Sequence, residues 1–319
     1  MLMPLEPHIQ ERLFSRRRRS LSPASGGDTS LPQVHLIGAS GAGMTALSEV
    51  LFDFGWKLTG SDLQIATETA EPTQPVSTSG RILKIHHGHD SANVPDSADL
   101  VVFSPAIGAD NPERLAAAQL GIPQVSYVEF LGELLRNEIS VCVAGTHGKT
   151  TTSALTASIL REAGIASSAV IGGEIIQYGR SGWGSGHRSN TDESAALFVI
   201  EACEYRRHFL HFHPRIAAIL NVEADHFDYF KTLDDSFEAF ASFAAQVEPD
   251  GTLIVRADCP LVTALRNDCQ ANVETFLPVG HESGAGRYAS ARADWAISSL
   301  REEQHRTVFD VVRQGRTFG

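Results

Sequence analysis

VCVAGTHGKTTT, residues 141–152, is a short apolar run that passes into a glycine-containing turn and then into Lys-Thr-Thr. The apolar run predicts a buried strand that ends at Gly145, and the apolar residues that recur from Ala154 to Leu160 predict a helix after the turn. A junction of this kind lets backbone N–H groups and a helix N-terminus converge on phosphate oxygens. The stretch therefore predicts a site for the phosphates of a nucleotide.

Two side chains of this loop carry the expected chemistry. Lys149 places a mobile positive charge within reach of β- and γ-phosphates, and the hydroxyl of Thr150 can ligate Mg²⁺. The loop departs from the full phosphate-loop pattern, because Val143 stands where that pattern has its first glycine. The alternative is a structural junction whose lysine is merely solvated. The order of strand, glycines, lysine and hydroxyls favours ATP binding.

Composition excludes several classes of protein. A length of 319 residues suggests about two domains, and an apolar fraction of 42% is enough for buried cores. The net charge of −12 argues against a general surface for nucleic acid or anionic membranes. No apolar run approaches the roughly 20 residues of a membrane span, and the N-terminus lacks the apolar core of a signal peptide. The four cysteines show no metal-ligand spacing and indicate reduced thiols in a cytoplasmic protein.

Residues 1–31 predict a disordered extension ahead of the folded domains. The segment contains four consecutive arginines, residues 16–19, followed by Ser, Pro, Gly and Asp. Such a composition buries too little apolar surface to fold. The arginines could instead touch nucleic acid or a membrane, although no aromatic or amphipathic pattern accompanies them.

Residues 32–137 predict a Rossmann-like first domain. A strand over 33–38 leads into a turn with three glycines and then into a helix, so the backbone can approach a diphosphate at the helix N-terminus. Asp62 ends the second predicted strand, where dinucleotide folds often place an acidic residue. Ser104 ends a continuous apolar strand, at the sheet edge where ligands of open α/β sheets bind.

The glycine pattern alone leaves other interpretations open. Its spacing is Gly-x-x-Gly-x-Gly, so NAD binding and a purely structural turn are both alternatives. His-His-Gly-His at residues 86–89 could hold a metal ion, but neighbouring side chains point in alternate directions and no acidic or cysteine partner has ligand spacing. We interpret these residues as a loop at the rim of the nucleotide site.

Residues 138–319 predict an ATP-binding α/β domain with a mostly parallel central sheet. One apolar strand ends in Glu201, and another, over 215–220, precedes a polar cluster that contains His226. Because carboxyl ends of parallel strands share one edge, both should lie beside the ATP loop. Glu201 suits Mg²⁺, which takes carboxylate and phosphate oxygens, although an ordinary strand-end carboxylate is the alternative. His226 could ligate a second metal ion or meet the phosphate.

Two further patterns complete this domain. The segment 179–190, rich in glycine and serine, predicts a loop. Residues 293–300 and 307–313 predict an antiparallel pair of strands.

The chain resembles the Mur ligase family, whose members build the peptidoglycan precursor. The likeness is dense over residues 35–44, 60–62 and 145–152, and again at Glu201 and over 221–226. It implies a Rossmann-like UDP-binding domain followed by a phosphate-loop α/β ATPase domain, with ATP and Mg²⁺ as cofactors.

The resemblance also implies a role for each matching residue. Lys149, Glu201 and His226 would be catalytic, and Mg²⁺ would be held by Thr150, Glu201 and His226. The implied ATP-binding residues are Gly145, Thr146, His147, Gly148, Lys149, Thr150 and Thr151. The implied UDP-sugar-binding residues are Gly38, Gly41, Ala42, Gly43, Met44, Asp62 and Ser104, with Ser40 standing where the family usually has glycine.

The reaction that the resemblance implies is ATP-dependent ligation of L-alanine to UDP-N-acetylmuramate through an acyl phosphate. Residues 104–113 and 204–210 resemble the members that add L-alanine, whereas the members that recycle a tripeptide share the ATP loop and are the alternative. The family's third domain is missing, so we expect a truncated chain or a fragment. A non-catalytic UDP-sugar-binding module and an NAD-linked oxidoreductase are the other hypotheses, and a homodimer is an open expectation.

Overall fold

The computed structural model describes residues 10, 13, 31–64, 84–136, 138–185, 196–277, 293–304 and 306–318. The chain forms two compact units, the first made of Met1–Glu138 and Ala154–Val199, the second of Ile139–Ser153 and Ile200–Gly319. The predicted disordered extension lies outside the described residues except at positions 10, 13 and 31. The predicted domain limits, 32–137 and 138–319, remain a proposal.

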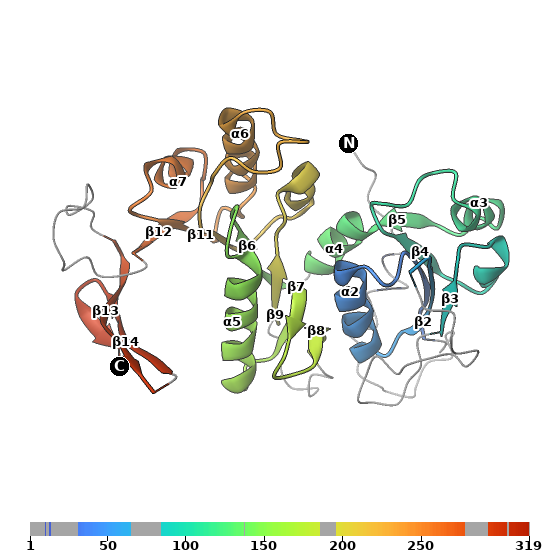
Figure 1. Ribbon diagram of the computed structural model, residues 1–319, viewed down its shortest axis with the longest axis horizontal. Coiled ribbons are helices and arrows are strands. Elements are labelled where there is room, and N and C mark those ends of the chain that lie inside the picture. The colour runs from blue at the N-terminus through green and yellow to red at the C-terminus, as the bar shows by residue number, and fades with distance from the viewer. Residues whose placement is uncertain are drawn as a thin grey trace. The chain divides into compact units, whose positions relative to one another are not determined.

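A five-stranded parallel sheet forms the centre of the first unit (Figure 1). Its order across the sheet is β3 (Lys84–His87), β2 (Lys57–Asp62), β1 (Gln33–Ile37), β4 (Leu100–Phe103) and β5 (Gln124–Ser126). The chain therefore leaves β1 toward one side of the sheet and leaves β4 toward the other, which places a topological switch point between them. The α/β prediction is confirmed. His86 and His87 end β3 and do not lie in the predicted loop, because they pair with Ser61 and Asp62 of β2.

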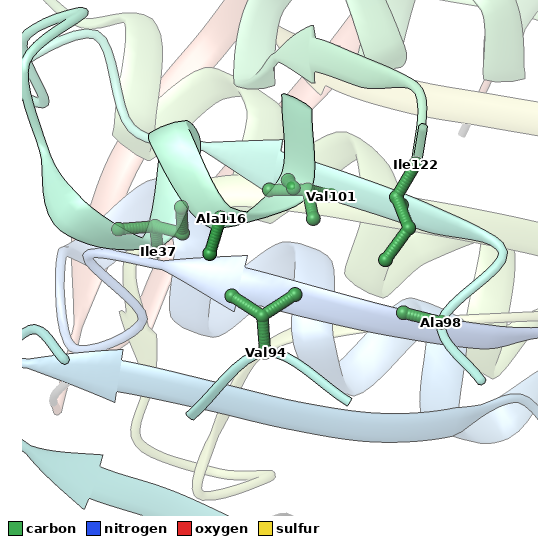
Figure 2. Packing of buried hydrophobic residues seen from close by; sticks show 7 residues of the cluster. Ile37, Val94, Ala98, Val101, Ala116 and Ile122 are labelled. Carbon is green, nitrogen blue, oxygen red and sulfur yellow. The ribbon is translucent and has the colours of Figure 1, made fainter. Parts of the chain in front are cut away.

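The described residues of this part of the first unit form the helices α2 (Ala42–Asp53), α3 (Pro112–Gln119) and α4 (Tyr127–Leu135). A short 3₁₀ turn, η2 (Ser91–Asn93), precedes β4. The side chain of Asn111 caps α3, and Ser126 forms a capping box with Glu129 at the start of α4. Figure 2 shows apolar side chains of β1, β4, α3 and the connecting segments packed together. This cluster consists of Ile37, Val94, Ala98, Val101, Ala116, Ala117 and Ile122.

A hairpin of β7 (Ser167–Ile175) and β8 (Arg180–Trp183) packs against α2. The buried carboxylate of Glu49 on α2 accepts hydrogen bonds from the backbone of Ser181 at 2.9 Å and Gly182 at 2.7 Å. The prediction of a loop over 179–190 is wrong for 180–183. A glycine-rich segment forms a strand here because β7 and Glu49 supply its hydrogen-bond partners.

Two other contacts hold the hairpin on α2. Arg180 donates to Asp53 at 2.8 Å, and the backbone N–H of Gly184 donates to the same carboxylate at 2.9 Å. A Cβ added to Gly182 would collide with the backbone of Ala46, so the close approach requires glycine.

The strands of the second unit form a mostly parallel sheet, as predicted. The order of the sheet to which they belong is β15 (Arg316–Phe318), β14 (Arg306–Arg313), β13 (Trp295–Glu303), β12 (Asn272–Leu277), β11 (Thr252–Arg256), β10 (Ile216–Ile219), β6 (Ile139–Ala144), β9 (Leu197–Glu201), β7 and β8. β6 pairs with β10 in parallel. The pairs β10–β11, β11–β12 and β12–β13 are parallel as well. β13, β14 and β15 are antiparallel, which confirms the predicted pair near the end of the chain.

The helical elements associated with these strands are α5 (Lys149–Glu162), η3 (Tyr205–His211), α6 (Leu233–Ala244), α7 (Pro260–Ala264) and η4 (Leu265–Asn267). Phe209 of η3 lies 4.7 Å from Phe243 and 5.2 Å from Phe240, both on α6, between ring centroids. These fully buried rings fasten η3 to α6.

All four cysteines are free thiols. Burial raises the pKa of Cys142 and of Cys203, which disfavours the thiolate form of both side chains. Among the described residues, no helix combines the length and the apolar composition that crossing a bilayer needs.

The packing of β8 on α2 generates a stability prediction. Replacing Gly182 with alanine should lower the free energy of unfolding by about 1–3 kcal/mol, because the added methyl group forces the two elements apart. Urea unfolding followed by circular dichroism measures the change. Ser181→Ala keeps the backbone N–H that donates to Glu49 and should stay within about 0.5 kcal/mol of the parent chain. Equal losses from both variants would contradict this account of the contact.

Candidate functional site

The loop after β6 takes a shape that needs glycine at two positions. Gly145 has φ of 140° and Gly148 has φ of 83°, both in the region that L side chains rarely adopt. A Cβ on Gly145 would also lie 3.2 Å from the backbone nitrogen of Asn221. The helix α5 begins immediately after the loop, at Lys149, and gives the strand–loop–helix arrangement predicted from the sequence.

Asn221, the second residue after β10, holds this loop. Its backbone oxygen accepts from the N–H of Thr146 at 3.1 Å, and its side-chain oxygen accepts from the N–H of His147 at 2.7 Å. Its side-chain amide donates in return to the carbonyl of His147 at 3.0 Å. The hydroxyl of Thr146 adds a contact by accepting from the N–H of Glu223 at 2.9 Å. The polar cluster predicted near the loop therefore lies against it.

The ammonium group of Lys149 folds back onto the loop. It donates to the carbonyl oxygens of Gly145 at 2.6 Å and Thr146 at 3.0 Å, and to the carboxylate of Glu204 at 3.1 Å. Only 12% of the Lys149 side chain is exposed.

Glu204 is the site residue that sequence reasoning missed. Its side chain is 2% exposed, its Oε2 lies 3.0 Å from the ammonium of Lys149, and its Oε1 lies 3.6 Å from Nε2 of His226. The available signal was its position three residues after Glu201, in the segment that follows the same strand. The resemblance placed Glu204 in a matching segment without assigning it a role.

Thr150 and Glu201 meet beside Lys149, as the sequence predicted. The hydroxyl of Thr150 donates to Oε1 of Glu201 at 3.0 Å. These are two hard oxygen donors at the edge of a phosphate loop, a set that suits Mg²⁺ when phosphates and water supply its other ligands. The described residues contain no cluster of three or more His, Cys, Asp or Glu side chains that could hold a metal ion alone.

His226 lies against Glu204 and Tyr205. Its ring centroid is 5.0 Å from that of Tyr205, whose hydroxyl donates to Asp228 at 2.8 Å. The hydrogen bond from Tyr205 lowers the pKa of Asp228. His226 itself has φ of 52°, and Arg206 and Arg207 also have left-handed backbone conformations, at 52° and 59°. Such conformations in non-glycine residues often occur at functional sites.

The glycine turn after β1 forms a second candidate site, wholly within the first unit. The N–H groups of Gly38 and Ala39 donate to the carbonyl of Ser61, and the N–H of Ser40 donates to Asp62 at 2.8 Å. The other oxygen of Asp62 accepts from the N–H of Gln64 at 2.9 Å. Asp62 thus shapes its own loop, and the loop ends in the exposed residues Ser40, Gly41 and Ala42 at the N-terminus of α2.

The structure requires glycine at the three positions of this turn to different degrees and for different physical reasons. Gly38 has φ of 80°, and a Cβ there would lie 2.9 Å from Cβ of Ser104. A Cβ on Gly43 would lie 2.7 Å from the hydroxyl oxygen of Tyr127, so this glycine makes room for a ring of the chain itself. A Cβ on Gly41 would find only Gly38 O within 4 Å, at 3.6 Å. Met44 is buried in the first turn of α2.

A buried polar network lies beneath this turn. The carboxylate of Glu113 accepts from the hydroxyl of Ser61 at 2.5 Å and from Asn93 at 2.6 Å, and it lies 3.3 Å from Nε2 of His35. Nδ1 of His89 lies 2.9 Å from the same hydroxyl of Ser61. Burial raises the pKa of Glu113, but the hydrogen bonds from His35, Ser61 and Asn93 outweigh it and hold that pKa below its ordinary value.

Comparison with known families matches both parts of the chain. Residues 33–138 match the model described as "Mur ligase family, catalytic domain", and residues 143–318 match the model of the Mur ligase middle domain. Together they cover both the turn after β1 and the loop after β6.

Curated relatives are named as UDP-N-acetylmuramate–L-alanine ligases. The relative from Acetivibrio thermocellus is 38% identical over 76% of this chain and 49% of its own length. The relative from Chloroflexus aggregans is 43% identical over 74% of this chain and 47% of its own length. The chain therefore spans about half the length of the curated relatives that it matches.

A solved structure also resembles the chain closely. It is the UDP-N-acetylmuramate:L-alanyl-gamma-D-glutamyl-meso-diaminopimelate ligase from Neisseria meningitides. Its TM-score is 0.71 at 26% sequence identity, and the match covers 90% of this chain and 86% of that chain.

The network around Glu113 generates a prediction about pH. Because folding lowers the pKa of Glu113 from its ordinary value, its carboxylate contributes fully to stability at neutral pH. That contribution is lost as the pH falls through the folded pKa. Glu113→Gln should therefore lower the free energy of unfolding by about 1–3 kcal/mol at pH 7, and by less as the pH falls below about 4.

Urea unfolding at pH 7 and at pH 3.5 or below, values chosen to bracket about 4.5, measures this difference. Glu238→Gln, at an exposed position of α6, is the control and should change little at either pH. A deficit for Glu113→Gln that stays constant with pH would show that the ionised carboxylate is not the source of the stability.

Proposed function

The chain belongs to the Mur ligase family, and we propose that it ligates L-alanine to UDP-N-acetylmuramate at the expense of ATP. The observation that carries this proposal is the arrangement of side chains at the loop after β6. Lys149 donates to a carbonyl oxygen of the loop, and Thr150 donates to Glu201. The names of the curated relatives support the choice of substrates.

The reaction would proceed through an acyl phosphate. The lactyl carboxylate of UDP-N-acetylmuramate would attack the γ-phosphorus of ATP and release ADP. The amine of L-alanine would then attack the acyl carbon, lose a proton and displace inorganic phosphate, which leaves an amide bond. Little covalent chemistry falls to the protein, whose share is positioning and neutralisation of charge.

Each proposed residue of the ATP loop has a distinct part. The N–H groups of the loop and of the first turn of α5 would bind phosphate oxygens, and Lys149 would neutralise the charge of the transferring group. Thr150 and Glu201 would hold Mg²⁺, with His226 as the proposed third residue of the metal site. When bound, Mg²⁺ supplies additional neutralisation of phosphate charge. The proposed ATP-binding set remains residues 145–151.

The turn after β1 is the proposed UDP-sugar site. The exposed N-terminus of α2 would bind the diphosphate, because the first N–H groups of a helix have no partners within it. The proposed set comprises Gly38, Gly41, Ala42, Gly43, Met44, Asp62 and Ser104. Asp62 would act by shaping the turn, since both of its oxygens already accept hydrogen bonds from the turn and from the end of β2.

Ligation of a tripeptide to UDP-N-acetylmuramate is the second candidate function. The similarity to the ligase from Neisseria meningitides favours it. A cytoplasmic location, a homodimer and the absence of nucleic-acid and membrane partners remain predictions from the sequence.

One assay distinguishes these activities. Phosphate release from ATP is measured with UDP-N-acetylmuramate and either L-alanine or the tripeptide L-alanyl-γ-D-glutamyl-meso-diaminopimelate. Release with L-alanine supports the proposal, and release with the tripeptide alone supports the second candidate. Calorimetric binding of UDP-N-acetylmuramate without phosphate release in either mixture would indicate a binding module.

The position of Lys149 predicts a large effect on turnover. Lys149→Ala should lower the rate of phosphate release on the order of 10²-fold or more, because the transferring phosphoryl group loses its protein cation. Lys231→Ala, which removes an exposed lysine whose ammonium donates to the backbone oxygens of residues 227 and 228, is the matched control. Near-normal phosphate release by Lys149→Ala would exclude the proposed role of the loop.

Substitutions at two glycines after β1 should affect UDP-sugar binding and thermal stability differently. Gly41→Val should weaken UDP-N-acetylmuramate binding at least tenfold and leave the melting temperature within a few degrees, because the open position above Gly41 is where the diphosphate would approach. Gly43→Val should lower the melting temperature as well, through its collision with Tyr127. Calorimetry and thermal unfolding give the two readouts. Unchanged UDP-sugar binding by Gly41→Val would place the substrate elsewhere.

A further inference from the structure

The hydrogen-bonding capacity of the Lys149 ammonium is fully used. An ammonium group has three N–H donors, and three acceptors surround this one: the carbonyl oxygens of Gly145 and Thr146 and the carboxylate of Glu204. A phosphate oxygen could bind Lys149 only by replacing one of these acceptors. The identity of the replaced acceptor therefore affects how tightly ATP binds.

The two carbonyl oxygens are held in place by the loop. Thr146 is fixed by its hydrogen bonds to Asn221 and Glu223, and Gly145 lies in a left-handed conformation packed against Leu220 and Asn221. Releasing either carbonyl would require the loop itself to change shape. Glu204, in contrast, contacts Lys149 through its side chain. A rotation of that side chain would break the contact and leave the backbone of the loop unchanged.

Glu204 has a second partner within reach. Its Oε1 lies 3.6 Å from Nε2 of His226, and its Oε2 lies 3.0 Å from the ammonium of Lys149. A carboxylate that is 2% exposed cannot exchange Lys149 for bulk water at low cost. His226 is close enough to interact with the Glu204 carboxylate once Lys149 has left it.

We propose that Glu204 is a positioning residue that acts as the internal counter-anion of Lys149 while the phosphate site is empty. Binding of ATP would transfer Lys149 from Glu204 to the phosphates and leave Glu204 beside Nε2 of His226, whose other ring nitrogen would stay free for the proposed Mg²⁺. The inference rests on the proposed function only in taking ATP as the ligand of this loop. It assigns to Glu204 a role in nucleotide affinity that acts through Lys149.

The first test compares Glu204→Gln with the parent chain. The amide keeps the shape of the side chain but removes the anion that competes with phosphate. The dissociation constant for ATP, measured by calorimetry in EDTA so that no metal contributes, should fall on the order of 3- to 10-fold. Glu238→Gln removes an equal charge from an exposed position of α6 and should change the constant less than about twofold.

A double-mutant cycle tests whether Glu204 acts through Lys149. In a Lys149→Met background the ammonium is absent, so Glu204→Gln should no longer tighten ATP binding beyond the effect of Glu238→Gln. A merely structural role would lower thermal stability and weaken binding in both backgrounds. If Glu204→Gln does not fold, Glu204→Asp is measured in its place. The shorter carboxylate should hold Lys149 less closely and lower the dissociation constant by a smaller factor.

The outcomes separate this inference from the proposed function. Unchanged or weaker ATP binding by the folded Glu204 variant overturns the role of Glu204, as does tightening of equal size in the Lys149→Met background. Failure of the parent chain to bind ATP with or without Mg²⁺ overturns the proposed function itself. Tighter binding that disappears with Lys149 supports the inference.

Discussion

Asn221 joins the loop after β6 to the end of β10, and the candidate ATP site depends on that junction. The backbone and the side chain of Asn221 hold two successive N–H groups of the loop, and its amide returns a hydrogen bond to His147. These contacts exist only because β6 and β10 are paired in one register, with Ala144 opposite Ile219. The phosphate loop is thus a product of sheet formation, and local sequence alone does not determine it. A slip in that pairing would move Asn221 away from the loop.

Local patterns predicted the parts of the site whose causes are local. A tight turn and a cation close to it are indicated by Gly145, Gly148 and Lys149. The alternation of strands and helices predicted that Glu201 ends a strand. Glu204 could not be found in this way. Its importance comes from meeting Lys149, which lies 55 positions earlier in the chain. Likewise, the reason for Gly43 is a ring contributed by Tyr127, which no spacing rule connects to the glycine.

The fold shows the same division between local and distant causes. The alternation of strands and helices along the sequence was sufficient to predict a mostly parallel sheet with helices. The segment 180–183 has the composition of a loop, and it becomes β8 because Glu49 and β7 satisfy its backbone. Intrinsic propensity was overridden there by tertiary hydrogen bonds. His86 and His87 were drawn into β3 by the same kind of pairing with β2.

The contact between Glu49 and β8 constrains how the family could exchange parts. Glu49 lies in the segment that sequence assigns to a first domain, and Gly182 lies in the segment assigned to a second, yet the two meet through a buried carboxylate. A chimaera joined at residue 138 would take α2 from one relative and the hairpin of β7 and β8 from another. If either parent lacked the carboxylate or the glycine, the hybrid would contain an unsatisfied buried charge or a steric clash. Recombination and engineering should therefore treat α2 and the hairpin of β7 and β8 as one module.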